Sequence, residues 1–428
     1  MKTDTLDVNN MDKNRSNFFS DSLTPDERKR LDRQFRLPGW DQETLKRSSV
    51  LIAGIGGLGT EIAKNLAMAG VGTLHLVDMD VIEYSNLNRQ ILFIGAEEGE
   101  SKAVAAARKL KEVNPYGSYI PHHGKLQSLD PMIFEEVDLY ISGLDNVEAR
   151  RDLARQAVHN GKPLIDGGTM TYYGHIYTYM PKANACLQCD PLKERERETL
   201  AACTLVGVPR KRSHCLLKGQ LFFESQTGRE PDTSNREEME KVLNYANRLV
   251  REHFPHEKEF TLDEAVSMID FHEPTVITIN AVIASIQSQE AIKALHQLHG
   301  RNIGQVNLEY TIYNGVTGKF FYLKKPPNPD CQLCGPQAPK ILSIKVPRSL
   351  VIENLELLLR KEGYLRNPDL DPSYYRMDGE DMEPLALDRT LHEENIRQGE
   401  TLYALGFIRN GEDIDIYVKI KYNEGRKP

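Results

Sequence analysis

Short apolar runs and amphipathic stretches alternate over the first part of the chain. Residues 50–53 form an apolar run that is typical of a buried parallel strand. Apolar side chains then recur at helical spacing, at Ile62, Leu66 and Ala69, before a second apolar run at 73–77. This strand–helix–strand order predicts an α/β domain.

The same alternation continues to residue 180 and returns later in the chain. Strands are predicted at 137–142, 162–168 and 174–180, helices at 101–113 and 275–295, and two further strands within 306–322. The sequence between these blocks is charged and polar, with a helix predicted at 237–253. We interpret this interruption, residues 203–266, as a mostly helical insertion into one α/β domain.

The last part of the chain has a pattern of its own. After a rigid linker at 326–329, a strand is predicted at 341–346 and a helix at 352–362. The motif D-R-T-L-x-x-x-N-I-x-x-G-x-T-L then starts at Asp388, and this order resembles the β-grasp fold of ubiquitin. The predicted domains are a flexible tail at 1–20, an α/β domain at 21–202 and 267–335, the insertion at 203–266, and a ubiquitin-fold domain at 341–422.

Composition narrows the class of protein. The chain has 428 residues, a formal net charge of −8 and a pI near 5.9, which argues against binding to the nucleic-acid backbone. No apolar run approaches the roughly 20 residues that span a bilayer, and residues 1–20 lack an apolar core. We therefore expect a soluble, cytoplasmic protein whose six cysteines serve metal or catalytic roles.

Glycines mark the turn after the first predicted strand. Gly54, Gly56 and Gly59 form G-x-G-x-x-G, with an extra glycine at Gly57. Asp78 ends the second strand, 19 residues beyond Gly59. Such glycines let the backbone approach phosphate, the helix N-terminus presents free N–H groups, and the acid accepts ribose hydroxyls. The pattern predicts a nucleotide site, for which NAD is the default ligand.

Three charged residues follow strand ends. Arg89 lies in a polar loop after Asp78, and Asp145 follows the strand predicted at 137–142. Lys102 falls in the first turn of a predicted helix, where the helix dipole disfavours a cation unless an anion is bound nearby. Because open α/β sheets place ligands at the carboxyl ends of their strands, we expect these three groups to face the nucleotide.

Two C-x-x-C pairs lie about 140 residues apart. Four thiolates suit tetrahedral zinc, and each pair supplies adjacent ligands from one turn. The ligands of this predicted zinc site are Cys186, Cys189, Cys331 and Cys334. A redox role for either pair is the competing interpretation.

Two cysteines remain, Cys203 and Cys215. Cys203 opens the insertion and is followed within 11 residues by Arg210, Lys211, Arg212 and His214. Positive charge close in space would favour a thiolate, whereas a free cysteine is otherwise a small buried apolar residue. The residues alone leave both roles open for Cys203.

Five motifs together resemble a known family, the E1-type (ThiF/MoeB-like) adenylating enzymes. They are G-I-G-G-L-G (54–59), D-M-D (78–80), S-N-L-N-R-Q (85–90), Lys102 and L-D-N-V-E-A-R (144–150). The match spans about residues 25–200 and 270–335. Members bind ATP on a Rossmann-like sheet and adenylate the C-terminal glycine of a ubiquitin-fold protein, so the resemblance replaces NAD by ATP with Mg²⁺.

The resemblance implies a role for each matched residue. Asp78 holds the ribose hydroxyls, and Asn86, Arg89 and Lys102 hold the phosphates. Asp145 coordinates Mg²⁺, and Arg150 lies near the nucleotide. The same motifs place the remaining nucleotide-binding residues at Gly54, Gly56, Gly57, Gly59, Asp80, Asn88, Gln90 and Asn146.

The segment C-T-L-V-G-V-P-R-K-R-S-H-C (203–215) resembles the catalytic-cysteine segment of the SUMO- and NEDD8-activating E1 catalytic subunits. This likeness implies that Cys203 forms a thioester with the modifier, that Cys215 is structural, and that the ubiquitin-fold domain recruits an E2 enzyme. A sulfur-carrier adenylyltransferase of MoeB or ThiF type, a non-catalytic E1-like scaffold and an NAD enzyme are the alternatives.

Arg33, in D-R-Q-F (32–35), matches an arginine that family members extend across a dimer interface into the neighbouring ATP site. Its presence implies a homodimer with two complete sites, although a heterodimer or a plain surface charge would also account for it. The expected partners are a ubiquitin-like protein ending in Gly-Gly and an E2 enzyme, with no nucleic acid and no membrane.

Overall fold

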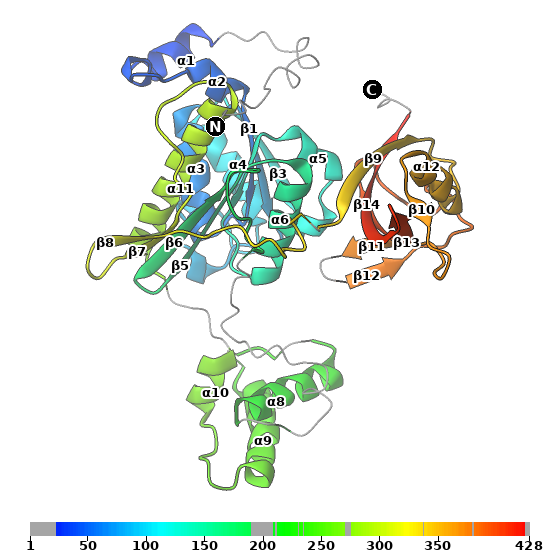
Figure 1. Cartoon of the computed structure of the whole chain (residues 1–428). Helices are drawn as coiled ribbons and strands as arrows, with labels where there is room; N and C mark the ends of the chain where they lie inside the picture. The colour runs from blue at the N-terminus through cyan, green and yellow to red at the C-terminus, as the bar shows by residue number, and fades with distance from the viewer. Residues whose placement is uncertain are drawn as a thin grey trace. The chain divides into compact units, whose positions relative to one another are not determined.

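The computed structural model divides the chain into two compact units (Figure 1). One unit comprises Met1–Pro191 with Thr275–Pro428, and the other is Leu192–Pro274. The structure describes residues 23–189, 209, 212–229, 231–233, 235–269, 275–336, 338–378 and 381–423. Each unit is described by itself below.

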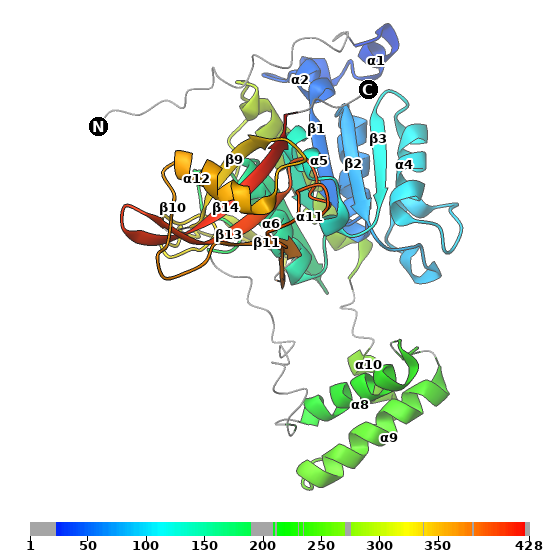
Figure 2. The ribbon, with the colours of Figure 1, turned by 90° about the vertical axis from the view of Figure 1, so that its right-hand side faces the viewer.

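The first unit contains a mixed sheet, in the order β3-β2-β1-β4-β5-β6-β7-β8 among its described residues. The strands are β1 (Ser49–Ala53), β2 (Thr73–Asp78), β3 (Ser118–His123), β4 (Leu139–Ser142), β5 (Leu164–Met170), β6 (Tyr173–Tyr179), β7 (Tyr310–Asn314) and β8 (Lys319–Leu323). Strands β1 to β5 pair in parallel, and β5 to β8 pair antiparallel. Figure 2 shows β1, β2 and β3 side by side.

Helices cover both faces of the sheet because the side chains of its buried strands alternate. Val50 and Ile52 of β1 pack against one set of helices, and Leu51 and Ala53 pack against another. The first set is α3 (Gly57–Ala69), α4 (Lys102–Val113) and α11 (Ile277–Leu298); the second is α5 (Pro131–Glu136) and α6 (Val147–Asn160). The predicted α/β class is confirmed, as a sheet of parallel strands with an antiparallel extension.

The antiparallel extension begins at a tight turn after β5. Only Thr171 and Tyr172 separate β5 from β6, and Thr171 has a φ of 52°. So short a connection joins antiparallel neighbours, because a parallel partner needs a crossover of a dozen or more residues. The strands predicted at 162–168 and 174–180 therefore form a hairpin.

A second sheet occupies the C-terminal part of the same unit. It has the order β12-β11-β13-β14-β9, with β10 paired to β13, among the described residues. Its elements are β9 (Lys340–Val346), α12 (Leu355–Lys361), β10 (Leu365–Arg366), β11 (Ser373–Asp378), β12 (Asp381–Pro384), β13 (Thr401–Arg409) and β14 (Glu412–Tyr422). Strands β9 and β14 are parallel, and Leu355 and Leu359 of α12 join a core that contains Leu402, Ile416 and Val418.

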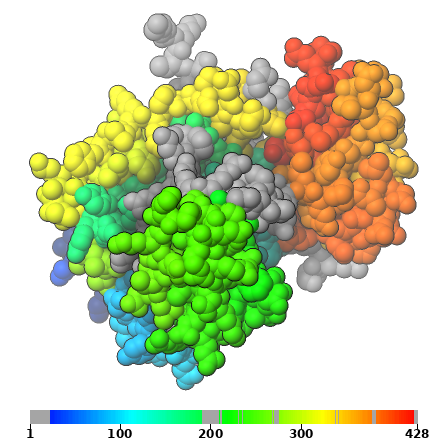
Figure 3. All heavy atoms as spheres, turned by 90° about the horizontal axis from the view of Figure 1, so that it is seen from below, coloured from blue at the N-terminus to red at the C-terminus, as the bar shows by residue number. Residues whose placement is uncertain are grey.

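The second unit is helical where it is described. It contains α8 (Arg212–Thr227), α9 (Arg236–His253) and α10 (Leu262–Ile269). These helices share a core that includes Cys215, Met239 and Val242. Its atoms form one continuous body, drawn in green in the space-filling view (Figure 3).

The chain before β1 forms α1 (Pro25–Arg30) and α2 (Gln42–Arg47). Thr24 and Glu27 make a capping box at the start of α1, which satisfies free N–H groups there. Among the described residues, no helix is both long and apolar enough to cross a membrane.

Candidate nucleotide and metal sites

The carboxyl ends of β1, β2 and β4 converge at the point where the strand order reverses direction. From β1 the chain runs outward through β2 and β3 on one side, and β4 and β5 lie on the other. Gly54 follows β1 with a φ of 84°, and a Cβ on it would lie 2.7 Å from the Gly143 carbonyl oxygen. Open α/β sheets bind ligands in the crevice at such a reversal.

The glycines of residues 54–59 play different structural roles. A Cβ on Gly59 would lie 1.9 Å from the Gly54 carbonyl oxygen, so glycine there permits close helix–strand packing. A Cβ on Gly56 would meet nothing within 4 Å, which leaves the backbone before α3 open to an approaching group. Gly57 lies against α11, where a Cβ would be 2.3 Å from Asn280 Nδ2. The loop therefore fits a phosphate at the α3 N-terminus.

Asp78 lies at the end of β2, next to this loop. One carboxylate oxygen accepts from the backbone N–H of Ile55 at 2.6 Å, and the other accepts from that of Asp80 at 2.8 Å. Burial raises the pKa of Asp78, and the two backbone hydrogen bonds oppose that rise. The carboxylate is thus held in place at the edge where a ribose would lie.

Lys102 is the first residue of α4 and is only 8% exposed. Its ammonium pairs with the Asp80 carboxylate at 2.8 Å, and its backbone N–H donates to the Asp80 carbonyl at 3.1 Å. The positive charge of Lys102 also acts on Asp78 and favours the ionised carboxylate. A buried ammonium at a helix N-terminus is well placed to meet an anionic ligand.

The loop between β2 and α4 positions Arg89. Asn86 is 5% exposed and its side-chain oxygen accepts from the backbone N–H of Glu83 at 3.3 Å. The Arg89 guanidinium donates to the Ser85 carbonyl at 2.9 Å and to Asn88 Oδ1 at 3.1 Å. Arg89 Cγ lies 3.8 Å from the position of a Cβ on Gly57, so this arginine borders the glycine loop.

Two further matched residues complete this loop. Gln90 is 4% exposed and its Oε1 has no hydrogen-bond partner among the described residues. Asn88 is exposed to solvent.

The β4–α6 loop contributes the other matched residues. Asp145 is exposed, and Asn146 caps α6 by accepting from the backbone N–H of Ala149 at 2.7 Å. Arg150 points inward instead of toward solvent: its guanidinium donates to the carbonyls of Leu144 at 3.0 Å and Gly167 at 2.6 Å. Arg150 therefore holds the loop that carries Asp145 against β5.

One buried amide at this edge was not singled out from the sequence. Asn280 lies in the first turn of α11 and is 1% exposed. The signal available in the sequence is a lone asparagine in the otherwise apolar run of residues 276–286, broken besides only by Thr278 and Ser285.

The four predicted zinc ligands lie together. All four sulfur atoms are within 4.8 Å of one another, with Cys186–Cys331 at 3.7 Å and Cys189–Cys334 at 3.3 Å. Burial raises the pKa of Cys186, and raises that of Cys334 to about 11, so a bound cation would favour the thiolate form of these two residues. The donor set of four sulfurs suits zinc.

Cys203 lies outside the described residues, so its role stays a prediction. Cys215 is fully buried in the core shared by α8 and α9, and burial raises its pKa to about 11, as expected of a structural thiol.

The sequence singles out two further arginines, Arg212 in α8 and Arg33 ahead of α2. Arg212 pairs with both carboxylate oxygens of Glu264, at 2.8 and 2.9 Å. Arg33 is exposed, just before the short helix Gln34–Arg36.

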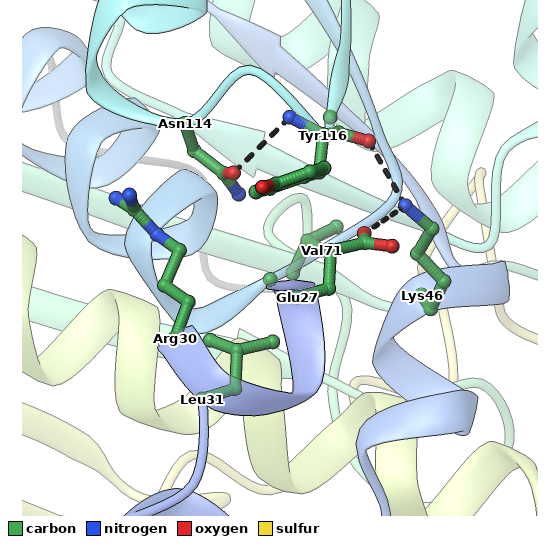
Figure 4. Close-up of a pocket in the computed structure, with 9 residues that line it drawn as sticks. Glu27, Arg30, Leu31, Lys46, Val71, Asn114 and Tyr116 are labelled. Atoms are coloured by element: carbon green, nitrogen blue, oxygen red, sulfur yellow. Dashed lines mark hydrogen bonds and ion pairs between the residues drawn. The ribbon is translucent and has the colours of Figure 1, made fainter. Parts of the chain in front are cut away.

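A separate pocket lies at the opposite, amino edge of the sheet (Figure 4). Lys46 bonds there to Glu27 and, at 2.9 Å, to the Tyr116 carbonyl. Asn114 Oδ1 accepts from the backbone N–H of Tyr116 at 3.2 Å. These paired groups fasten α1 and α2 to the sheet, so this pocket is structural.

The fold and the edge site together define a protein with a Rossmann-like sheet and a candidate nucleotide site. The chain belongs to the ThiF family, whose model matches residues 30–333. This confirms the E1-type resemblance drawn from the motifs, and with it the expectation that the chain is an enzyme of this type.

Curated relatives agree with that assignment. A protein of Dictyostelium discoideum named NEDD8-activating enzyme E1 catalytic subunit is 30% identical over 307 residues, covering 67% of this chain and 68% of its own length. The protein of the same name in Saccharomyces cerevisiae is 31% identical over 299 residues, covering 67% of this chain and 97% of its own length. Among solved structures, E. coli MccB with succinimide has a TM-score of 0.44 at 19% identity, covering 69% of this chain and 68% of that one.

Proposed function

We propose that this chain uses ATP to activate the C-terminal glycine of a ubiquitin-like protein and then carries the acyl group as a thioester. The observation that carries the proposal is the buried ammonium of Lys102, which begins α4 beside Asp78 and Asp80. The helix dipole disfavours a cation at that position, and a bound polyphosphate would reverse the effect. Relatives named as NEDD8-activating enzyme catalytic subunits support the choice of substrate class.

The first step joins two anions. A carboxylate oxygen of the terminal glycine attacks the α-phosphorus of ATP, the bond to the bridging oxygen breaks, and pyrophosphate leaves. Lys102 and Arg89 offset the repulsion between the reactants, and Asp145 would hold the Mg²⁺ that supplies further positive charge. Asp78, held by two backbone N–H groups, accepts the ribose hydroxyls.

The second step moves the acyl group to sulfur. The Cys203 thiolate attacks the activated carbonyl, the bond to the phosphate oxygen breaks, and AMP leaves. This step rests on the sequence match of residues 203–215. The C-terminal domain would then bind an E2 enzyme; its helix α12 over a sheet with the parallel pair β9 and β14 supports a β-grasp assignment.

Pyrophosphate exchange tests the activation step. Purified chain should exchange labelled pyrophosphate into ATP when a ubiquitin-like protein ending in Gly-Gly is added. Replacing Cys203→Ala should keep this exchange and remove a thiol-sensitive covalent adduct. A sulfur-carrier adenylyltransferase would show the exchange without an adduct on Cys203, and a scaffold would show neither.

Deletion of residues 341–428 tests the C-terminal domain. The shortened chain should form the thioester and transfer it poorly to an E2 enzyme. Unchanged transfer to the E2 enzyme would contradict the assignment of the C-terminal domain.

Two further measurements test the metal site and the dimer. Metal analysis should find about one zinc ion per chain, and sedimentation should give a dimer if Arg33 serves a neighbouring site.

A further inference from the structure

Asn280 presents an unsatisfied donor at the nucleotide edge of the sheet. Its Oδ1 accepts from the Thr169 hydroxyl at 2.7 Å and from the Thr275 hydroxyl at 2.9 Å. Its Nδ2 is buried and has no hydrogen-bond partner among the described residues. A buried N–H without a hydrogen-bond partner destabilises the fold, so such groups call for an explanation.

The surroundings of Asn280 place its amide nitrogen on the side of the glycine loop, with the two threonine hydroxyls, themselves 3.2 Å apart, at its oxygen. The two threonine hydroxyls hold the oxygen, and the nitrogen on the other side lies against Gly57, the first residue of α3. A Cβ on Gly57 would be 2.3 Å from Asn280 Nδ2 and 3.8 Å from Arg89 Cγ. The amide and the arginine thus approach the same point, at the helix end with free backbone N–H groups.

We propose that Asn280 Nδ2 donates a hydrogen bond to a phosphate oxygen of the nucleotide bound at the N-terminus of α3. Thr169 and Thr275 are positioning residues that orient the amide. The inference rests on the proposed function, because it names one more contact to the ATP of that reaction. It adds a neutral donor to the charges of Arg89 and Lys102.

An anionic oxygen is the acceptor that this location favours. The α3 N-terminus carries the positive end of the helix dipole, and Gly56 leaves open space beside it. Hydrogen bonds from a buried donor to a charged acceptor are stronger than those between neutral groups. The contact also requires glycine at position 57, because the Cβ of any other residue would occupy the space next to Asn280 Nδ2.

Equilibrium binding of ATP with Mg²⁺ to the full chain tests the contact. Asn280→Ala removes the donor and should weaken ATP binding about tenfold, as expected for a hydrogen bond to a charged group. Asn280→Asp keeps the shape but places an oxygen toward the phosphate, so it should bind at least tenfold more weakly than Asn280→Ala. Ser288→Ala, a buried change on the same helix, should bind ATP as the wild type does.

The outcomes separate this inference from the proposed function. If the wild-type chain does not bind ATP, the proposed function fails. If it binds ATP and both Asn280 variants bind equally well, or Asn280→Asp binds no worse than Asn280→Ala, the contact is wrong. Should both variants unfold, Thr169→Val decides: it should weaken ATP binding two- to fivefold, and an unchanged affinity overturns the inference.

Discussion

Each edge of the larger sheet carries a lysine paired with a carboxylate, and the two pairs differ in which partner is buried. At the amino edge, Lys46 is bonded to the buried Glu27 and to the Tyr116 carbonyl (Figure 4). At the carboxyl edge, Lys102 is itself more buried but its partner, Asp80, is half exposed. A lysine whose partner is buried fastens elements together, whereas a buried lysine whose partner faces solvent can exchange that partner for a ligand.

Backbone contacts repeat the contrast. A Cβ on Gly72, at the amino edge, would lie 1.8 Å from the Lys46 carbonyl oxygen, so that glycine only allows packing. At the carboxyl edge, Gly56 faces open space and Asn280 leaves a donor without a partner in the described part of the chain. The amino edge thus pairs the groups described there, whereas the carboxyl edge leaves open space and an unpaired donor at the proposed nucleotide site.

The largest expected effect comes from exchanging the two lysines for alanine. Lys102→Ala should lower pyrophosphate exchange at least a hundredfold, because the phosphates lose a buried cation. Lys46→Ala should leave the exchange within about twofold and lower the free energy of unfolding by about 1–3 kcal/mol, because Glu27 stays buried without its partner. If the two variants lost pyrophosphate exchange equally, the proposal that only the carboxyl edge binds the phosphates would be wrong.

Gly57→Ala tests the contact between α3 and α11. The added Cβ would be 2.3 Å from Asn280 Nδ2, so we expect a loss of about 1–3 kcal/mol in the free energy of unfolding. Adding Asn280→Ala should restore more than half of that loss, since the clash disappears. Denaturant unfolding of the two single variants and the double variant measures this coupling, and strict additivity would contradict it.

The amino edge should be sensitive to acid. Burial would raise the pKa of Glu27, but the Lys46 ammonium and hydrogen bonds from Thr24 outweigh it and lower that pKa. The stabilisation is therefore complete above the ordinary value of 4.5 and is lost as the pH falls through the lower pKa of the folded chain. Wild type should lose about 1 kcal/mol more than Lys46→Met between pH 5 and pH 3, measured by urea unfolding; parallel curves would argue against the pair.

The smallest effect is expected from Asp80→Asn. The Asp80 side chain is half exposed, and asparagine keeps an oxygen that can accept from Lys102, so stability should change by less than about 0.5 kcal/mol. If Asp80 only orients Lys102, ATP affinity should change less than about threefold. A larger loss in equilibrium binding would indicate that Asp80 itself contacts the nucleotide.

The sequence was most informative where burial dictates the pattern. The strand at 50–53 is predictable because a strand buried on both faces is continuously apolar. The helix after the glycines is predictable because its apolar side chains recur at helical spacing. Strand β3 was missed because Ser118–His123 is an edge strand with mostly exposed side chains. Its polar sequence carries no alternation that a pattern could detect.

The site was predictable in its residue types and less so in their orientation. Motif matching predicts that Lys102, Arg89 and Asp78 face one ligand; in the structure they lie near the glycine loop, and their contacts with a nucleotide stay a prediction. The same matching predicts Arg150 near the nucleotide, which stays a prediction; nothing in the sequence indicates that its guanidinium bonds to two backbone carbonyls. Asn280 depends on contacts between segments more than 100 residues apart, which no local pattern encodes.

The cysteine cluster joins the chain on either side of the helical unit. Cys186 and Cys189 precede that unit and Cys331 and Cys334 follow it, so a bound ion turns the stretch between them into a closed ring. A protease that cuts once within residues 192–274 would then yield two fragments that migrate together under native conditions. The larger sheet takes strands from both fragments, since β6 precedes the cut and β7 follows it, so it would stay assembled.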